Sequence, residues 1–230
     1  MRAALSVVIP ALNAEKALPA CLAALMEGLE AGLIRELVVS DGGSGDATVR
    51  IAEEVGAIVL RGPASRGGQL RCGVAAAQGD WVMLLHADTV LEPGWSEAVI
   101  AHMQTGGAGY FRLGFRAQGL AATWVAGWAN RRARWFGLPY GDQGLVVPRA
   151  VLEAAGGVPD IPLMEDVALV RALRGQLRAL PVTARTSAER YETEGWFRRG
   201  RRNLWLLCRY LCGADPARLE QDYRRSGRRS

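Results

Sequence analysis

The chain has 230 residues, of which 50% are hydrophobic and 22% are charged, and its formal net charge is +5. This length suits one large α/β domain and leaves little room for two complete domains. The composition excludes a largely disordered chain. No stretch reaches the roughly 18 apolar residues that a membrane-spanning helix needs, and the first residues lead into a strand pattern rather than a secretory leader. We therefore expect a cytoplasmic protein.

The first half of the chain alternates short β-branched runs with segments of helical composition. Because these runs are apolar on both faces, we expect buried parallel strands covered by helices on both sides. Strands and helices that alternate at this spacing indicate a doubly wound α/β sheet. The expected strands span residues 7–9, 37–39, 57–60 and 82–85, and the expected helices span 15–30, 46–55, 67–78 and 93–103.

The second half predicts strands at 110–115 and 146–147, an amphipathic segment to about 136, and helices at 151–155, 167–174 and 195–212. In the last helix the apolar residues fit one face, with arginines opposite. We expect a single domain over 1–212 and a basic C-terminal helix or tail over 213–230. From Arg198 onward there are ten arginines and three acidic residues. This end suits phosphates, an acidic membrane or nucleic acid, or else is a solvated helix face and a frayed tail.

The four cysteines are scattered along the chain and lack the spacing of zinc ligands. Cys208 and Cys212 are four residues apart and would share one helix face, but no second pair lies near them in sequence. We expect packing cysteines and no disulfide.

Polar segments follow the expected strands at four places. In an open parallel sheet, ligands bind at the carboxyl ends of the strands. We therefore expect Asp41, Asp88 and Asp166 to line one pocket. The four segments span residues 10–15, 40–46, 86–89 and 164–166.

The first of these segments argues against a dehydrogenase. A dinucleotide-binding fold needs a glycine-rich turn after its first strand, so that the backbone can approach a pyrophosphate. Here that turn is Pro-Ala-Leu-Asn-Ala, without glycine, and the glycines at 42, 43 and 45 follow the second strand with the wrong spacing. A hydride-transfer enzyme is excluded.

The same segments resemble the serial motifs of family 2 glycosyltransferases, which have the GT-A fold. The resemblance rests on residues 8–15, 41–46, 86–89 and 165–166 together and covers roughly residues 5–180. The His-Ala-Asp-Thr segment and Tyr140–Gly144 resemble a small bacterial branch of that family. The resemblance implies a Rossmann-like, mostly parallel sheet flanked by helices, to which the apolar pattern of the last segment adds amphipathic helices at the C-terminus. It also implies an enzyme that uses a nucleotide-diphosphate sugar, with a UDP-sugar favoured.

The resemblance assigns the donor nucleotide to two loops. Asp41 matches the position whose carboxylate accepts a hydrogen bond from the base, although a carboxylate there also suits a helix cap. Asp46 is better explained as a cap. The loop that would wall the base and ribose contains Pro10, Ala11, Asn13 and Glu15.

Asp88 is the candidate metal ligand that the resemblance implies. It follows the apolar run 81–85, where an unpaired carboxylate would be costly. Mg²⁺ or Mn²⁺ at this oxygen would bind the two phosphates. His86 stands where the family usually has an acidic residue, so it either binds the ribose or shifts the preference toward Mn²⁺. Ala87, between them, belongs to the same donor site.

Two arginines and three carboxylates complete the candidate site. Arg66 and Arg71 flank a helix start, which favours an anion site for the diphosphate, with a plain surface arginine as the alternative for Arg66. The resemblance makes Asp166 the general base that takes the proton of the acceptor hydroxyl, with Glu165 as the alternative base and an N-terminal cap as the structural explanation. Asp142 would orient the acceptor or the donor sugar.

Trp124, Trp128 and Trp135 recur at helical spacing among Arg131, Arg132 and Arg134. A core stripe is the favoured explanation, ahead of a headgroup-level membrane surface and a sugar-stacking groove. From this pattern we predict peripheral membrane contact only, and an acceptor that is unknown but could be lipid-linked.

The favoured function is an inverting, divalent-metal-dependent glycosyltransferase that does not bind nucleic acid. One alternative is a nucleotidyltransferase, which would need a glycine- and arginine-rich first loop that this chain lacks. The other is a non-catalytic basic module on a membrane surface or nucleic acid, which would not need carboxylates at separate strand ends.

Overall fold

The structure is a computed structural model that describes residues 3–227, and within this range eight strands form one sheet. The sheet has the order β3-β2-β1-β4-β7-β6-β8-β5. Its strands are β1 (Leu5–Ala11), β2 (Ile34–Asp41), β3 (Ile58–Arg61), β4 (Trp81–Leu84), β5 (Val90–Leu91), β6 (Ala108–Phe115), β7 (Leu145–Pro148) and β8 (Leu177–Thr186).

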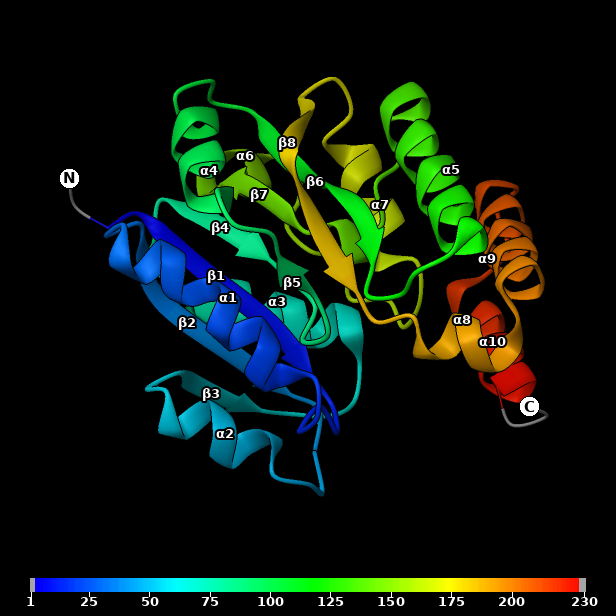
Figure 1. Ribbon diagram of the computed structural model, residues 1–230, viewed down its shortest axis with the longest axis horizontal. Helices are drawn as coiled ribbons and strands as arrows, with labels where there is room; N and C mark the ends of the chain where they lie inside the picture. The colour runs from blue at the N-terminus through cyan, green and yellow to red at the C-terminus, as the bar shows by residue number, and fades with distance from the viewer. Residues whose placement is uncertain (1–2, 228–230) are drawn as a thin grey trace.

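Helices cover the sheet, and the C-terminal helices lie beyond it at one end of the molecule (Figure 1). They are α1 (Leu18–Glu30), α2 (Thr48–Glu54), α3 (Arg66–Ala76), α4 (Trp95–Met103), α5 (Leu120–Phe136), the 3₁₀ turn η1 (Gly141–Gln143), α6 (Arg149–Ala154), α7 (Glu165–Ala172), α8 (Glu189–Glu194), α9 (Trp196–Leu211) and α10 (Pro216–Gly227).

The first four strands of the sheet order are parallel, as predicted. The register pairs Ala11 with Asp41 and Val8 with Leu84, so β1, β2 and β4 end along one edge of the sheet. β7 then runs antiparallel to β4 and β6, while β6 and β8 are parallel. The mostly parallel α/β fold predicted from the sequence is confirmed.

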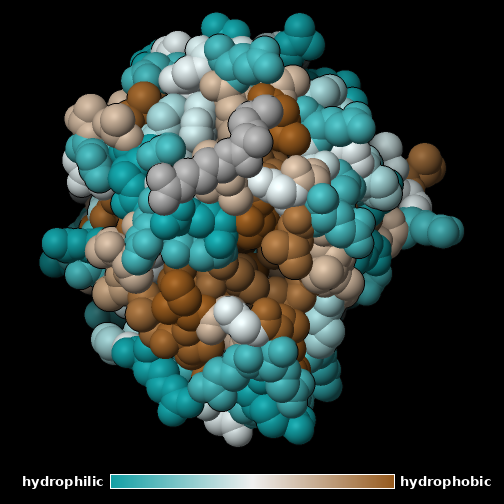
Figure 2. Space-filling model, turned by 90° about the vertical axis from the view of Figure 1, so that its left-hand side faces the viewer, coloured by the Kyte–Doolittle hydropathy of each residue, from teal (hydrophilic) through white to brown (hydrophobic). Residues whose placement is uncertain are grey.

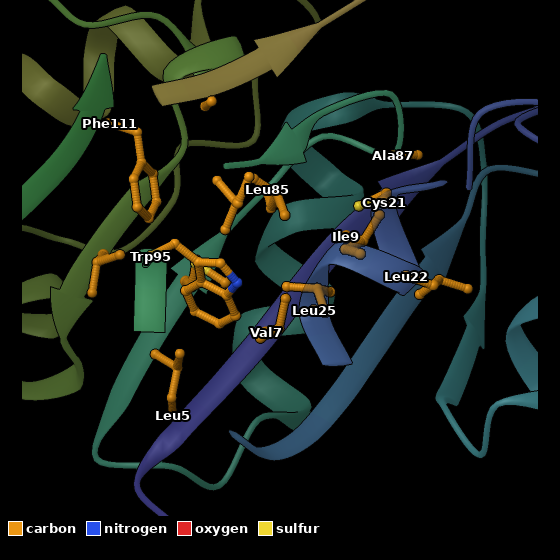
Figure 3. Packing of buried hydrophobic residues seen from close by; sticks show 14 of the residues in the cluster. Leu5, Val7, Ile9, Cys21, Leu22, Leu25, Leu85, Ala87, Trp95 and Phe111 are labelled. Atoms are coloured by element: carbon orange, nitrogen blue, oxygen red, sulfur yellow. The ribbon is translucent and has the colours of Figure 1, made fainter. Parts of the chain in front are cut away.

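Alternation of β1 side chains between the two faces builds two cores, because successive strand residues point to opposite sides. Val7 and Ile9 pack with α1 and α4, whereas Val8 packs with α3, α6 and α7. Figure 3 shows the first core, where Trp95 from α4 lies among residues of β1 and α1. Trp95 is fully buried and its indole N–H donates to the Ala24 carbonyl at 2.9 Å. Burial of each such side chain contributes about 1.5–3 kcal/mol.

Two strands were missed by the sequence pattern, β5 and β8. β5 has only two residues, too few to show a period. β8 contains Pro181, which lacks the N–H that a regular ladder needs. The pairing of β6 with β8 is irregular between Tyr110 and Arg112, and Pro181 sits in this irregularity, where a proline is tolerated. β3 forms the edge of the sheet and is only partly buried, unlike the prediction for that run.

The aromatic side chains of α5 and α9 do not form a core stripe, so the favoured explanation of that pattern is wrong. Trp124, Trp128 and Trp135 are 59%, 41% and 66% exposed, and Trp205 is 62% exposed. The arginine Arg199, expected on a solvated face, is buried. The two helices lie side by side at one end of the molecule (Figure 1).

The segment after residue 212 is not a frayed tail over its described part. α10 packs against α9, and Leu219 is fully buried with Leu206, Leu207 and Val167. The proposed domain limit at 212 therefore separates two parts that share one small core.

Among residues 3–227, no helix is both long enough and apolar enough to cross a bilayer. All four cysteines are free; Cys21 is buried and the other three are exposed, so the packing role predicted for them holds only for Cys21. Figure 2 shows the side of the molecule away from α9 and α10, where an apolar area is bordered by hydrophilic side chains.

The close contact of α3 with the loop before α7 predicts a sensitive glycine. A Cβ on Gly67 would lie 2.5 Å and 2.6 Å from the carbonyl oxygens of Pro159 and Ile161, which are backbone atoms. Alanine gains up to about 1 kcal/mol in a helix, but this overpacking costs about 1–3 kcal/mol. We expect Gly67→Ala to lower the free energy of unfolding in urea denaturation. Gly45→Ala, which meets nothing within 4 Å, is the control, and equal stability of the two variants would contradict the packing.

Candidate active site

A cleft of about 590 Å³ opens at the carboxyl edge of β1 and β4. Its size is that of a small-molecule site. The walls come from the loops after β1 and β4, the start of α3, η1, the start of α7 and the helices α8–α10. Of the site residues predicted from the sequence, those that line it are Pro10, Ala11, Asn13, Arg66, His86, Ala87, Asp88, Asp142, Glu165 and Asp166.

Asp41 does not line the cleft, so the predicted convergence is wrong for this residue. It is only 2% exposed, and its carboxylate accepts hydrogen bonds from the backbone N–H groups of Gly43 and Ser44 at 2.9 Å and 3.0 Å. These contacts form a turn within the loop after β2 and not the helix cap that was the alternative, because α2 begins only at Thr48.

Glu15 also lies outside the cleft lining, because its carboxylate joins two loops. Its Oε2 accepts from Ala47 N at 3.1 Å, and its own N–H donates to Asp46 Oδ2 at 3.1 Å. Asp46 Oδ1 accepts from Thr48 N at the start of α2, as a cap residue should. Asn13, which does line the cleft, accepts from Gly45 N at 2.9 Å. These bonds hold the loop after β1 against the loop after β2.

The two arginines predicted at the start of α3 separate. Arg66 lines the cleft, and its Nε lies 3.7 Å from Glu165 Oε1. Arg71 is absent from the cleft lining and pairs with Asp160 at 3.9 Å on the surface. Arg71 lies five residues after Arg66 in α3, so its side chain points to a different side of the helix, away from the cleft.

Gln69 is a site residue that the sequence analysis missed. It lines the cleft from α3, and its amide N–H₂ donates to the carbonyls of Ala11 at 2.8 Å and Ser40 at 2.7 Å. The side chain thus joins the ends of β1 and β2 where the loops begin. The available signal was a polar residue next to Leu70 on the buried side of a helix.

The three carboxylates of Asp88, Asp142 and Asp166 are close enough to interact. Burial raises the pKa of Asp142 to about 6; Arg132 opposes this, and Asp166 and Asp88 add to it. The Oδ1 atom of Asp142 is buried and has no hydrogen-bond partner within residues 3–227. A buried carboxylate next to two others is costly, and such groups cluster at functional sites.

Glu165 is the most buried carboxylate of the site, with a side chain 2% exposed. Burial and the neighbouring Asp166 raise its pKa, and Arg66 opposes the rise. Asp166 is held differently. Its Oδ2 accepts from Gly141 N at 2.8 Å and its Oδ1 from Val167 N at 2.7 Å. These two bonds fix the position of the carboxylate beside η1.

His86 is neutral at physiological pH. Burial lowers its pKa to about 3, and the positive charges of Arg66 and Arg190 contribute. A Cβ on Gly141 would lie 2.5 Å from His86 Nε2. Glycine at 141 thus lets η1 approach the imidazole and also places its own N–H against Asp166.

The residues of the cleft fit a cation only together with a phosphate ligand. Within residues 3–227, no three His, Cys, Asp or Glu side chains form a group that could hold a metal ion. Mg²⁺, however, is often bound by one or two carboxylates together with substrate phosphates. Asp88, with Asp142 and Asp166 nearby, matches that mode of binding.

A second buried network supports η1 from behind. Gln143 is fully buried; it donates to the Phe111 carbonyl at 3.1 Å and accepts from Tyr140 N at 3.3 Å. Arg132 of α5 lies over the Tyr140 ring, 3.4 Å from its centroid. The sequence analysis grouped Arg132 with the surface arginines, whereas its side chain is buried and acts on Asp142.

The C-terminal helices form the wall of the cleft opposite the nucleotide loops, and this wall was not predicted. Arg190 and Tyr191 of α8 line it, as do Arg199 and Asn203 of α9. Arg190 Nη1 donates to the Tyr223 hydroxyl at 3.2 Å, and Arg199 Nη2 does so at 2.9 Å. No motif marked these positions, because they reach the cleft only through the packing of α8–α10.

Comparison with known proteins places this geometry in a family. The profile described as glycosyl transferase family 2 matches residues 6–138, more than half of the chain. The chain belongs to this family. The matched range contains the loops after β1, β2 and β4, and it ends before Asp142, Glu165 and Asp166. The family and the fold together make the protein a glycosyltransferase.

Solved structures of glycosyltransferases share this family 2 fold. Residues 1–349 of S. aureus TarS superpose with a TM-score of 0.61 at 16% identity, over 95% of this chain and 68% of that chain. The structure of TarS with UDP-GlcNAc superposes with a TM-score of 0.60 at 15% identity, over 80% of this chain and 58% of that chain. M. tuberculosis glucosyl-3-phosphoglycerate synthase superposes with a TM-score of 0.57 at 20% identity, over 80% of this chain and 70% of that chain. Comparison with curated protein sequences finds no match. At these identities the likeness is one of fold.

The raised pKa of Asp142 predicts a pH-dependent stability. The ordinary value is 3.8 and the folded value about 6, so the contribution of this group to stability is present below pH 4 and is lost as the pH rises through 6. Asparagine cannot ionise. Without divalent cations, we expect the free energy of unfolding of Asp142→Asn to exceed that of the wild type by about 2 kcal/mol at pH 8. Near pH 3.5 we expect no difference between the two proteins. Urea denaturation at both pH values measures this, and a variant no more stable at pH 8 contradicts it.

Proposed function

We propose that this family 2 glycosyltransferase moves a sugar from a nucleotide-diphosphate sugar to an acceptor hydroxyl, with inversion and with a divalent cation. The observation that carries the proposal is the shared cleft of Asp88, Asp142 and Asp166, with Arg66 beside them. The carboxylates can bind a divalent cation, and the guanidinium of Arg66 can bind a diphosphate. The nucleotidyltransferase alternative does not account for the family match, and the non-catalytic alternative accounts for neither that match nor the carboxylates.

A UDP-sugar is the favoured donor. The solved structure of TarS contains UDP-GlcNAc, and that of glucosyl-3-phosphoglycerate synthase contains UDP-glucose. We assign the base and ribose to Pro10, Ala11 and Asn13, which line the cleft at the end of β1. Glu15 and Asp41 act indirectly, because their carboxylates fix the loops that carry these residues.

Asp88 is our candidate ligand for Mg²⁺ or Mn²⁺. When bound, the cation would neutralise the diphosphate and stabilise it as it leaves. The synthase structure with UDP contains Mn²⁺. His86, being neutral, keeps a nitrogen that can bind a softer cation or the ribose. The His-Ala-Asp-Thr segment supports our proposal that the chain belongs to the small bacterial branch that it resembles.

Asp166 is the candidate general base. It would take the proton from the acceptor hydroxyl as the acceptor oxygen bonds to the anomeric carbon and the bond to the diphosphate oxygen breaks. Attack from the face opposite the leaving group inverts the configuration. Asp166 is favoured over Glu165 because two backbone N–H groups hold its carboxylate at the cleft, whereas Glu165 is almost fully buried and burial raises its pKa. Asp142 would then orient a sugar hydroxyl.

Residues 1–212 would form the catalytic domain, and the segment from 213 would complete its acceptor side. α10 reaches the cleft through Glu220 and Tyr223. The acceptor would therefore lie between η1 and the helices α8–α10. A lipid-linked acceptor remains our prediction, and so does the cytoplasmic location.

Removal of the Asp88 carboxylate should abolish cation-dependent donor binding. Without it, the cation loses its charged protein ligand, and the diphosphate then meets unscreened carboxylates. We expect Asp88→Ala to weaken UDP binding in the presence of Mn²⁺ by at least about 100-fold in calorimetry. Asp160→Asn, which removes a carboxylate on the surface outside the cleft, should bind as the wild type. Unchanged binding by Asp88→Ala refutes the metal assignment.

Neutralisation of Asp166 should separate binding from transfer. The amide keeps the shape of the side chain but cannot take a proton at neutral pH. We expect Asp166→Asn to bind UDP like the wild type and to release UDP from a UDP-sugar about 10²–10⁴-fold more slowly, with water as acceptor. Normal turnover would show that Asp166 is not the base, and a matching loss in Glu165→Gln alone would transfer the role to Glu165.

A further inference from the structure

α9 is turned inside out relative to an ordinary surface helix. Several of its arginines are buried or half-buried and paired: Arg199 is 7% exposed and donates to Glu194 Oε1 at 2.6 Å, and Arg202 pairs with the same carboxylate at 2.8 Å. Arg209 pairs with Asp222 of α10 at 2.6 Å. The large apolar side chains that point outward are Phe197, Leu204, Trp205 and Leu211, exposed by 64%, 41%, 62% and 44%. Their spacing of seven, one and six residues places them within about one third of the helix circumference, so they lie on one side of α9.

α5 extends this apolar side. Leu120, Trp124, Trp128 and Trp135 are 90%, 59%, 41% and 66% exposed, and their spacing of four and seven places them on one stripe. The ring centroids of Trp124 and Phe197 are 5.6 Å apart, which joins the stripes of α5 and α9. Together they form one surface, which we call the aromatic face: Leu120, Trp124, Trp128, Trp135, Phe197, Leu204, Trp205 and Leu211.

The charge around the aromatic face is of one sign. Arg131 and Arg134 of α5 and Arg198 and Arg201 of α9 are exposed. Neither helix contains an acidic residue. Tryptophan suits the headgroup level of a bilayer, because its ring is apolar and its N–H is polar. Arginines at its border are complementary to anionic lipids.

The opposite side of α9 lines the catalytic cleft. Arg199, Asn203 and Leu206 face the cleft, while the aromatic face points away from it. The two surfaces are therefore separated by the thickness of a helix, about 10–12 Å. A flat surface in contact with the aromatic face would lie beside the acceptor wall.

We propose that the aromatic face docks the enzyme on an anionic lipid bilayer, with Trp124, Trp128, Trp135 and Trp205 at headgroup depth. The docking stands on the exposed residues alone; its consequence, that the acceptor is presented by the membrane, rests on the proposed function. The exposed arginines at its border favour an anionic lipid surface as the partner.

Flotation with vesicles tests the docking. We expect the wild type to bind vesicles of phosphatidylcholine and phosphatidylglycerol at least about tenfold more than vesicles of phosphatidylcholine alone, and less at high salt. The double variant Trp124→Ser/Trp205→Ser should lose this binding about tenfold, since it removes two anchors from the face. Met26→Ser/Leu29→Ser, which changes two exposed apolar residues of α1, is the matched control and should bind as the wild type.

UDP binding in the presence of Mn²⁺, measured on the same variants, separates this proposal from the transfer reaction. Retained UDP binding with lost flotation supports the docking surface even if no transfer is found. Wild-type protein that floats equally with both vesicles or with neither overturns the proposal. So does a wild-type dimer that the tryptophan variant converts to a monomer without any effect on vesicles, because the aromatic face is then an interface between two copies.

Discussion

Burial of several carboxylates around one cleft is the constraint on which the site depends. Burial raises the pKa of Asp142, and the neighbouring carboxylates of Asp166 and Asp88 add to this rise. Arg66 and Arg132 offset part of it. A surface that only binds other molecules would gain nothing from this arrangement. In the proposed function, a cation and a diphosphate would offset the cost of burying these carboxylates, and the cluster agrees with the family assignment.

The fold holds this cluster through buried amide side chains and backbone contacts. Gln69 joins the ends of β1 and β2, and Gln143 fixes η1 to β6. Gly141 then brings its N–H to Asp166 and leaves room for His86. These contacts join strands to loops. The register of the sheet therefore determines where the loop side chains of the site lie. The two sides of α9 differ in the same way: polar side chains face the cleft, and aromatic side chains face the solvent.

Residues that follow regular strands could be predicted, and those that depend on packing could not. Periodicity and the polar strand ends placed Asp88, Asp166 and Arg66 at one edge of a parallel sheet. The positions of Asp41 and Glu15 outside the cleft lining could not be predicted, because a motif gives the position of a carboxylate but not its hydrogen-bond partners. β8 was missed because Pro181 breaks the strand pattern. The tryptophans of α5 were expected in the core, since helical spacing shows which residues share a face and not whether that face is covered.

The position of a bound cation tests the account most directly. Crystals of the wild type grown with UDP and Mn²⁺, measured at a wavelength where manganese scatters anomalously, would locate the ion. We predict one strong anomalous peak in the cleft about 2 Å from a carboxylate oxygen of Asp88, in contact with both phosphates of UDP and near Asp166. A peak elsewhere, or UDP bound away from Asp88, would contradict the assignment of this cleft as the donor site.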